Sequence, residues 1–480
     1  MVVTEYKWVV LTVTTVGAFM AALDSSVLIV GLPTVLHELN ATLIHGVWVM
    51  TGYRLATTIL LVSIGRVADM LGRVRLYNLG FAIFTLASAL CGLSQTGDQL
   101  VVFRLLQGIG GALLIVNSVT LIADVFPSKE LGTGIGVNFM AFNLGSIVGY
   151  TISGLMVELV GWRFIFFINI PVGLFGTLWA HLRLRETHRG VSEKFDYLGA
   201  ILYSGALTLI LIALSLESPS SQLELLLLAA GLLILPLFVM VERRVAHPTL
   251  DLDLFKIRPF SAGNLASFLN SVAFSALPFV LTLYLQLVRH EDAVVTGLMF
   301  IPMEIAVLIL GPLSGKMSDR YGAMGLSTIG LIFNTAALVW FSALDLNTSY
   351  AAVTLGLIAA GVGRGLFISP NASSIMGQVS PAKRGVGNGI RTTVVQTAVV
   401  VSLPLSLKFM TLGMPYEALS QITAGNITPS AEETLTFLSA LRYPLRLSAI
   451  IVFLALIPSL LRGRKTAGEK QEIRELLEGT

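Results

Sequence analysis

The chain is a series of long apolar runs separated by short polar segments. A helix that crosses the hydrocarbon core of a bilayer needs about 20 mostly apolar residues, and fourteen segments of this sequence meet that requirement. The predicted spans lie near residues 8–31, 47–68, 75–94, 98–122, 132–157, 163–182, 197–216, 222–241, 260–287, 293–315, 325–344, 350–372, 385–408 and 441–461. A closed β-barrel would instead show short segments of alternating polarity. The pattern therefore predicts an all-α polytopic membrane protein.

A short motif with glycines around an aspartate occurs twice. Gly-Arg-Val-Ala-Asp-Met-Leu-Gly at 65–72 returns as Gly-Lys-Met-Ser-Asp-Arg-Tyr-Gly at 315–322, which is 250 residues later. Eight predicted spans separate the copies, whereas duplication of a six-span unit would separate them by six. We therefore expect two spans, 197–241, to be inserted between two pseudo-symmetric six-helix bundles, an organisation typical of secondary transporters.

The polar segments give the expected boundaries of these parts. We predict a first bundle at 1–185, a two-helix insert with flanking cytoplasmic segments at 186–258, a second bundle at 259–463 and a cytoplasmic tail at 464–480.

The distribution of basic residues indicates the orientation of the chain in the membrane. When the turns are placed alternately on two sides, the side with the N-terminus and the tail carries 22 of the 31 lysines and arginines. By the positive-inside rule this side is cytoplasmic. We expect a multi-pass protein of the plasma membrane with both termini in the cytoplasm.

Composition excludes several classes of function. Only 12% of residues are charged, against roughly a quarter in soluble proteins, so the lipid bilayer is the main solvent, and a net charge of +3 indicates no nucleic-acid partner. The glycine-rich stretch 311–317 lacks the spacing of a phosphate-binding loop, and no His, Cys or Ser constellation has catalytic spacing. We expect a non-enzymatic monomer without cofactors or metals. Any pumping must draw its energy from an ion gradient or from an external partner, whose identity the sequence does not give.

The two turn motifs are candidates for a cytoplasmic gate. Their glycines allow helix ends to approach closely, their aspartates can receive the N-terminal end of the following helix, and Asp124 is a suitable carboxylate partner for Arg73 or Arg66. The alternative is that these arginines only anchor the topology. The predicted gate residues are Gly65, Asp69, Gly72, Arg73, Asp124, Gly315, Asp319 and Arg320.

Charged residues within the spans are the strongest functional candidates. Each costs roughly 2.5 to 3.5 kcal/mol on insertion scales. Asp24 lies roughly 24 Å along the first span from Trp8, at about 1.5 Å per residue, and Arg54 and Arg104 lie at a similar depth. We expect these three charges to meet, with Asp24 either taking and releasing protons or forming a fixed ion pair with the arginines.

Glu304 lies near the middle of the tenth span, with Arg364 and Arg391 as the partners nearest in depth. It is predicted to be a second proton carrier, a site for cationic substrates or a clamp between helices.

An adaptable apolar cavity is expected to hold the substrate. Phe139, Asn143, Asn270 and Phe274 are predicted members of its lining, although residues of these types also face lipid or neighbouring helices.

Several motifs carry a family resemblance. Arg104-Leu-Leu-Gln-Gly-Ile-Gly-Gly-Ala, Leu23-Asp-Ser-Ser-Val-Leu-Ile-Val-Gly-Leu-Pro33 and Gly161-Trp-Arg-Phe-Ile-Phe-Phe-Ile-Asn-Ile-Pro171, together with the turn motif, resemble the major facilitator superfamily, and more narrowly its fourteen-span drug:proton antiporter branch. The resemblance implies alternating access between two six-helix bundles and exchange of small amphipathic compounds for protons. In the fifth span, Tyr150 stands where the antiporter pattern has proline, so we expect close packing without a proline kink.

The resulting hypothesis is proton-coupled export of lipophilic or cationic drugs. One alternative is a lipid or glycolipid exporter of the same fold, which would need a lateral opening between the two bundles. A second alternative is a membrane sensor or scaffold that binds a ligand without transporting it.

Overall fold

The structure is a computed structural model of the 480-residue chain. It describes residues 2–127, 130–186, 196–216, 222–245, 250–380 and 383–462. Within these ranges the side chains of 2–5, 62, 65, 66, 69, 319, 384 and 385 are not described. The predicted tail at 464–480 therefore lies outside the described residues.

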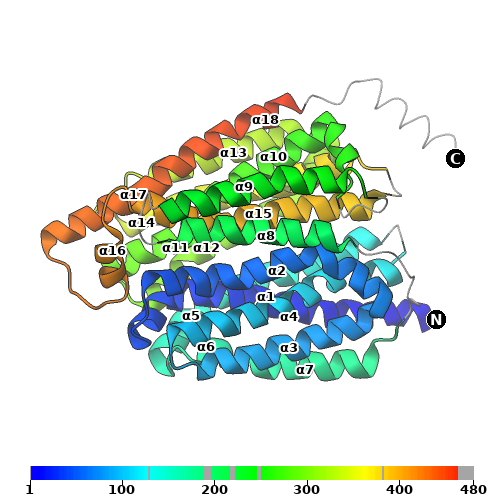
Figure 1. The fold of residues 1–480 in the computed structure, drawn as a ribbon, viewed down its shortest axis with the longest axis horizontal. Coiled ribbons are helices and arrows are strands. Elements are labelled where there is room, and N and C mark those ends of the chain that lie inside the picture. The colour runs from blue at the N-terminus through cyan, green and yellow to red at the C-terminus, as the bar shows by residue number, and fades with distance from the viewer. Residues whose placement is uncertain are drawn as a thin grey trace.

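The first half of the chain forms a bundle that occupies the lower part of Figure 1. Its helices are α1 (Val2–Glu38), α2 (Leu43–Leu71), α3 (Arg73–Leu93), α4 (Gly97–Val125), α5 (Leu131–Leu159), α6 (Phe164–Phe167) and α7 (Asn169–Arg183). Because α6 and α7 follow each other directly, they act as one span, Phe164–Arg183.

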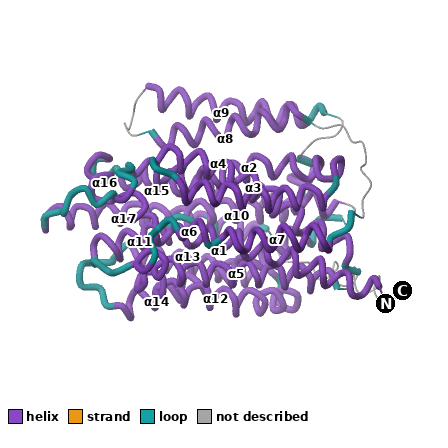
Figure 2. Tube along the Cα trace, turned by 90° about the horizontal axis from the view of Figure 1, so that it is seen from below, coloured by secondary structure: helices purple, strands orange, loops and turns teal. Residues whose placement is uncertain are grey.

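Two helices, α8 (Tyr197–Ser215) and α9 (Gln222–Glu242), follow the first bundle and pack against each other. Figure 2 shows them along one edge of the molecule. Tyr203 and Leu207 of α8 pack with Leu55 of α2 and Val400 of α15. The insert therefore covers one side of the boundary between the two halves.

The second bundle occupies the upper part of Figure 1. Its elements are the short 3₁₀ helix η1 (Leu252–Lys256), α10 (Arg258–Phe274), α11 (Leu277–Leu283), the π-helical turn η2 (Tyr284–Val288), α12 (Ala293–Tyr321), α13 (Ala323–Phe341), α14 (Tyr350–Met376), α15 (Arg384–Met410), α16 (Tyr416–Thr423), α17 (Ala431–Leu454) and α18 (Leu456–Leu461).

The predicted all-α fold is confirmed. Thirteen spans in the described part of the chain are long and apolar enough to cross a membrane, and the 29-residue α2 packs among them as the fourteenth long helix. The last span begins earlier than predicted, because Ser430 and Glu433 form a capping box that starts α17 at Ala431 rather than near residue 441. The surface helix α16 was not predicted.

The two bundles repeat the same close helix contacts. A Cβ at Gly108 of α4 would lie 2.4 Å from the carbonyl oxygen of Tyr53, and one at Gly361 of α14 would lie 2.3 Å from that of Met303. Tyr53 and Met303 are 250 residues apart, which is the spacing of the turn motifs. The sequence duplication is therefore also a duplication of backbone packing, which only glycine permits at these crossings.

The spans run horizontally in Figure 1, with the start of α1 at the right-hand end and α16 at the left-hand end. We call the end that holds the start of α1 the terminal face and the other end the opposite face. The turn motifs lie on the terminal face.

Candidate functional site: charged residues inside the helix bundle

The two bundles are joined at the opposite face. The backbone N–H of Leu43 donates to Ser420 Oγ at 3.1 Å, and that of Ile44 donates to the hydroxyl of Tyr416 at 3.0 Å. Gln286 Nε2 donates to the carbonyl of Val30 at 3.0 Å. These bonds tie α1 and α2 of the first bundle to η2 and α16 of the second.

Helices α5 and α12, one from each bundle, also pack closely near the opposite face, with their backbones in direct contact. A Cβ at Gly154 would lie 2.4 Å from the backbone of Val294, and one at Gly297 would lie 2.1 Å from the carbonyl oxygen of Tyr150. The rings of Tyr150 and Phe300 pack at 5.0 Å between centroids. As the sequence predicted, α5 is one uninterrupted helix with small residues at its contacts.

Asp24 is sealed inside the first bundle. The residue is 0% exposed, and Arg104 of α4 is 1% exposed. Arg104 Nη1 donates to Asp24 Oδ2 at 2.6 Å, while Oδ1 accepts from Gln107 Nε2 at 2.8 Å and from Asn169 Nδ2 at 2.9 Å. Three donors from α4 and α7 therefore hold the carboxylate of α1.

Arg104 is itself fixed by several contacts. Its Nε donates to the carbonyl of Val49 at 3.0 Å, and its Nη1 also donates to Gln107 Oε1 at 2.6 Å. The guanidinium lies over the ring of Tyr53, 4.6 Å from the centroid, and near that of Phe166 at 5.9 Å. Such stacking stabilises a desolvated cation.

Of the three charged residues that were expected to meet, the structure brings two together. Asp24 and Arg104 form an ion pair, but Arg54 makes no hydrogen bond or ion pair with either of them among the described residues. Arg54 lies instead beside a small cavity between the two bundles. Hydropathy places a residue in depth, whereas its direction around the helix axis depends on packing.

Glu304 has the partner that its depth suggested. Arg364 Nη1 of α14 donates to Glu304 Oε1 of α12 at 2.9 Å. The glutamate side chain is 5% exposed, and that of Arg364 is 28% exposed. In contrast to Asp24, Glu304 is held by one side chain only in the described structure, and that side chain is partly accessible.

The Glu304 pair is close to the contact between the bundles. Phe300, which packs on Tyr150, precedes Glu304 by one helical turn and is its neighbour on the surface of α12. A change in the charge of Glu304 would therefore act next to the α5–α12 contact.

Arg391, the other partner expected for Glu304, does not contact it. Its guanidinium donates to Asn388 Oδ1 through Nε at 3.2 Å and through Nη2 at 3.1 Å. No carboxylate lies within ion-pair distance of Arg391 in the described part of the chain.

The first turn motif has the predicted ion pair. Arg73 Nη1 donates to Asp124 Oδ1, which joins the start of α3 to the end of α4. Gly72 separates α2 from α3 at φ 105°, in the region that favours glycine. Gly65 and Asp69 belong to α2, but Asp69 has no described side chain, so the role of this turn as a gate stays a prediction.

The second turn motif repeats the backbone but not this ion pair. Gly322 has φ 87°, matching Gly72, whereas Ala323 stands where Arg73 stands in the first copy. The exposed Arg320 lies over the ring of Tyr321, 5.4 Å from its centroid. Gly315 faces Ser369 of α14, and the side chain of Asp319 lies outside the described residues.

A different ion pair lies at the terminal face of the second bundle, where it joins the segments that precede η1 and α15. Lys383, before α15, donates to Asp251 Oδ2, before η1, at 2.7 Å. This hydrogen bond and the negative charge of Asp251 raise the pKa of the Lys383 ammonium.

Glu186 is a residue of the turn that sequence reasoning missed. Its Oε1 accepts from the backbone N–H of Arg73 at 3.0 Å, and Oε2 accepts from those of Val74 at 3.2 Å and Arg75 at 3.3 Å. The carboxylate thus caps the N-terminal end of α3, where unpaired N–H groups and the helix dipole favour negative charge. A partner 113 residues away in the sequence leaves no local signal.

The predicted cavity residues do not form one group. Asn143 Nδ2 donates to the carbonyl of Phe139 at 2.8 Å within α5, and Phe139 is exposed. Asn270 Oδ1 accepts from Asn334 at 2.8 Å inside the second bundle, and Phe274 is buried there in the apolar core. Their part in substrate binding stays a prediction.

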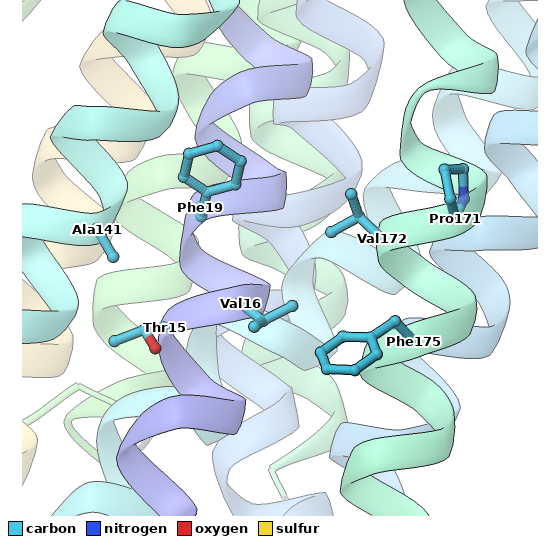
Figure 3. Close-up of a pocket in the computed structure, with 7 residues that line it drawn as sticks. All are labelled: Thr15, Val16, Phe19, Ala141, Pro171, Val172 and Phe175. Carbon is cyan, nitrogen blue, oxygen red and sulfur yellow. The ribbon is translucent and has the colours of Figure 1, made fainter.

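A larger pocket, of about 510 Å³, lies within the first bundle. Figure 3 shows side chains from α1, α5 and α7 around it. They are Thr15, Val16, Phe19, Ala141, Pro171, Val172 and Phe175. The lining of this pocket is almost wholly apolar. All of its lining residues belong to the first bundle, so the pocket is not the opening between the two bundles that a lipid exporter would need.

The chain is similar to known proteins along most of its length. Residues 14–403 match the model of the Major Facilitator Superfamily. The chain is 31% identical over 394 residues to the riboflavin transporter RibZ of Clostridioides difficile, covering 81% of this chain and 85% of that protein. It is 30% identical over 394 residues to the tetracenomycin C resistance and export protein of Streptomyces glaucescens, covering 81% and 73%.

Its fold is also found among solved structures. A bacterial homolog of the human lysosomal transporter Spinster, in an inward-facing and unoccupied conformation, superimposes with a TM-score of 0.67 at 16% identity, covering 95% of this chain and 97% of that one. The chain therefore belongs to the Major Facilitator Superfamily and is a multi-pass membrane transporter, not an enzyme.

Proposed function

We propose that the protein is a proton-coupled exporter of small lipophilic organic compounds and that Glu304 carries the proton. The observation behind this proposal is the contrast between two carboxylates inside the bundle. Asp24 accepts three hydrogen bonds in a sealed site, whereas Glu304 has one partner in the described structure, Arg364, whose side chain is 28% exposed. A carboxylate must exchange its arginine for a proton to act as a carrier, and this exchange is easier at Glu304.

The orientation follows from the basic residues. With 22 of 31 lysines and arginines on the terminal side, that face is cytoplasmic by the positive-inside rule, and we place the protein in the plasma membrane. Because the described bonds between the bundles gather at the opposite face, we interpret this arrangement as a state closed to the outside. Substrate then enters from the cytoplasmic side.

Protonation of Glu304 links the proton to this closure. A neutral Glu304 loses its Coulomb attraction to Arg364, which joins α12 to α14 in the present state. One turn away, Phe300 packs on Tyr150 of α5. Movement of α12 after protonation would therefore loosen the α5–α12 contact and favour the state open to the outside. The proton taken up outside is released on the cytoplasmic side when the closed state, with its Glu304–Arg364 pair, forms again.

Asp24 has a different role in this proposal. Removing the charge of a buried carboxylate that accepts from three donors leaves Arg104 without its counter-ion, at a cost of about 3 to 5 kcal/mol. We infer that the Asp24–Arg104 pair fixes α1 to α4 and keeps the first bundle rigid while the bundles move relative to each other.

The test is flux into proteoliposomes under an imposed pH gradient. Riboflavin, ethidium and naphthoate serve as probes, since they differ in charge and share a planar apolar body. We expect accumulation of at least one probe that reverses with the gradient and disappears with a protonophore. Glu304→Gln should abolish the response to the gradient, whereas Glu158→Gln, at an exposed position of α5, should retain it.

Flux that ignores the gradient would contradict proton coupling. A gradient response that survives Glu304→Gln would contradict the role of Glu304. Ligand binding without flux of any probe would favour the alternative of a sensor or scaffold.

A further inference from the structure

Two arginines inside the bundle have no acidic partner in the described part of the chain. Asp24 is paired with Arg104 and Glu304 with Arg364, but neither Arg54 nor Arg391 forms an ion pair among the described residues. A charged side chain in a transmembrane helix costs roughly 2.5 to 3.5 kcal/mol on insertion scales. Two such cations at the centre of a transporter therefore need a functional explanation.

Arg54 and Glu304 occupy equivalent positions in the duplicated halves, 250 residues apart. The equivalence is structural, since the neighbouring contacts of Gly108 with Tyr53 and of Gly361 with Met303 are repeated. Glu304 is neutralised by Arg364. The two equivalent positions therefore differ in charge. Among the described residues, Arg54 in the first bundle is a cation without an acidic partner, whereas Glu304 in the second bundle is an anion neutralised by Arg364.

Arg54 faces a small cavity at the boundary between the bundles. The enclosed space of about 30 Å³ is lined by Ile29, Met50, Thr51, Arg54, Ser275, Ala276, Phe279, Val399 and Leu403. These residues come from both bundles, and two hydroxyl groups accompany the guanidinium among apolar side chains. One water molecule needs about 10–15 Å³ of such space, so in this state the cavity has room for a few waters or a small polar group and not for a whole substrate.

Arg391 lies on the same side of α15 as this cavity. Residues 391, 395 and 399 follow one another at four-residue spacing, so they share a helix face, and Val399 lines the cavity. At 1.5 Å per residue, Arg391 is roughly 12 Å nearer the terminal face than Val399. A ligand that enters from that face would pass Arg391 before it reaches Arg54.

The site is also shielded from lipid. Leu55 and Val400, next in sequence to Arg54 and Val399, pack against Tyr203 and Leu207 of α8, and the hydroxyl of Tyr203 bonds to Thr397 Oγ1 at 2.6 Å. The inserted helices thus cover the α2–α15 boundary. Low solvent content strengthens the interaction between a guanidinium and an anion.

We propose that the central site binds organic acids. The carboxylate or sulfonate of the substrate pairs with Arg54, its apolar body lies against Met50, Phe279 and Leu403, and Arg391 attracts the anion from the cytoplasmic side. Arginine suits this task because its planar guanidinium presents paired donors to a carboxylate. The inference rests on the proposed transport function and names its substrate class, in place of the cationic drugs expected from the sequence.

Two probes that differ only in charge test this proposal. Naphthoate and naphthylmethylammonium share the same aromatic body, and their binding to the full chain in nanodiscs is measured by calorimetry, with empty nanodiscs subtracted. We expect the wild type to bind naphthoate at least about tenfold more tightly than the cation. Arg54→Gln should weaken naphthoate binding by about tenfold or more, as expected for one charge-assisted hydrogen-bonded pair.

Three variants separate recognition from general charge effects. Arg446→Gln removes one positive charge at an exposed position of α17 and should leave naphthoate binding unchanged. Arg54→Lys should recover only part of the affinity lost in Arg54→Gln, because it keeps the charge but not the paired donors of the guanidinium. Arg391→Gln should slow association more than it weakens equilibrium binding, with an effect that decreases in high salt.

The proposal is overturned if naphthoate does not bind, if the cation binds as tightly, or if Arg54→Gln binds naphthoate like the wild type. Flux driven by the pH gradient, measured on the same preparation, keeps the two claims apart. Gradient-driven flux without a preference for naphthoate contradicts the acid site alone, whereas the preference without gradient-driven flux contradicts the proposed function alone.

Discussion

The sealed pair of Asp24 and Arg104 gives a prediction that separates a fixed ion pair from a proton carrier. In Asp24→Asn, the Oδ1 atom can still accept from Gln107 and Asn169, but the new amide group places a donor opposite Arg104 Nη1. The guanidinium keeps its bonds to Val49 and Gln107 and loses its only counter-ion in the described structure. Removing one partner of a buried pair costs about 3 to 5 kcal/mol.

We expect the lower part of this range, about 3 kcal/mol, because Arg104 remains stacked on Tyr53 and Phe166. Arg104→Gln should cost a similar amount, since it leaves the carboxylate without its cation. The double variant should lose less than the sum of the two single variants, because the two neutral amide side chains that it introduces can bond to each other. The expected coupling is about 2 kcal/mol, within the range found for contacting residues.

The assay is the free energy of unfolding in mixed micelles as the fraction of denaturing detergent rises, measured for the wild type, both single variants and the double variant. Additive costs, or an Asp24→Asn variant as stable as the wild type, would refute the fixed pair. If that stable variant also lost its response to a pH gradient, Asp24 rather than Glu304 would be the proton carrier.

Three further predictions concern packing, closure and the turn. Gly361→Ala should destabilise the protein by about 1 to 3 kcal/mol through overpacking, because its Cβ would lie 2.3 Å from a carbonyl oxygen. The control is Gly205→Ala, whose Cβ would have no atom within 4 Å. It should leave the free energy of unfolding in the same detergent titration unchanged. Cysteines at Ile44 and Tyr416, joined by a short bifunctional reagent, should stop flux reversibly, and unchanged flux in the cross-linked protein would argue against closure at that face. Glu186→Ala should cost about 1 kcal/mol as a lost helix cap and speed amide exchange at the start of α3, with no effect expected elsewhere.

The sequence predicted the features that the bilayer imposes. Span length is fixed by membrane thickness, so the number and order of the long helices could be predicted from apolar runs. Depth follows from the residue count along a helix, and Asp24, Arg104, Glu304 and Arg364 were found at matching depths for this reason.

Directions around the helix axes could not be predicted in the same way. Helices that are apolar on all sides carry no marked hydrophobic face, so the pattern did not show that Arg54 lies at the boundary between the bundles. Gln107 and Asn169 were missed as ligands of Asp24, because a neutral polar residue in a span signals neither its partner nor its rotation.

The central claim is that Glu304, and not Asp24, takes up the proton, and infrared difference spectroscopy tests it on the carboxyl group itself. Spectra of the reconstituted protein at low minus high pH should show the carbonyl band of a buried protonated carboxylic acid in the wild type and in Asp24→Asn. The account predicts that this band is absent in Glu304→Gln. A band that persists in Glu304→Gln and disappears in Asp24→Asn would contradict it.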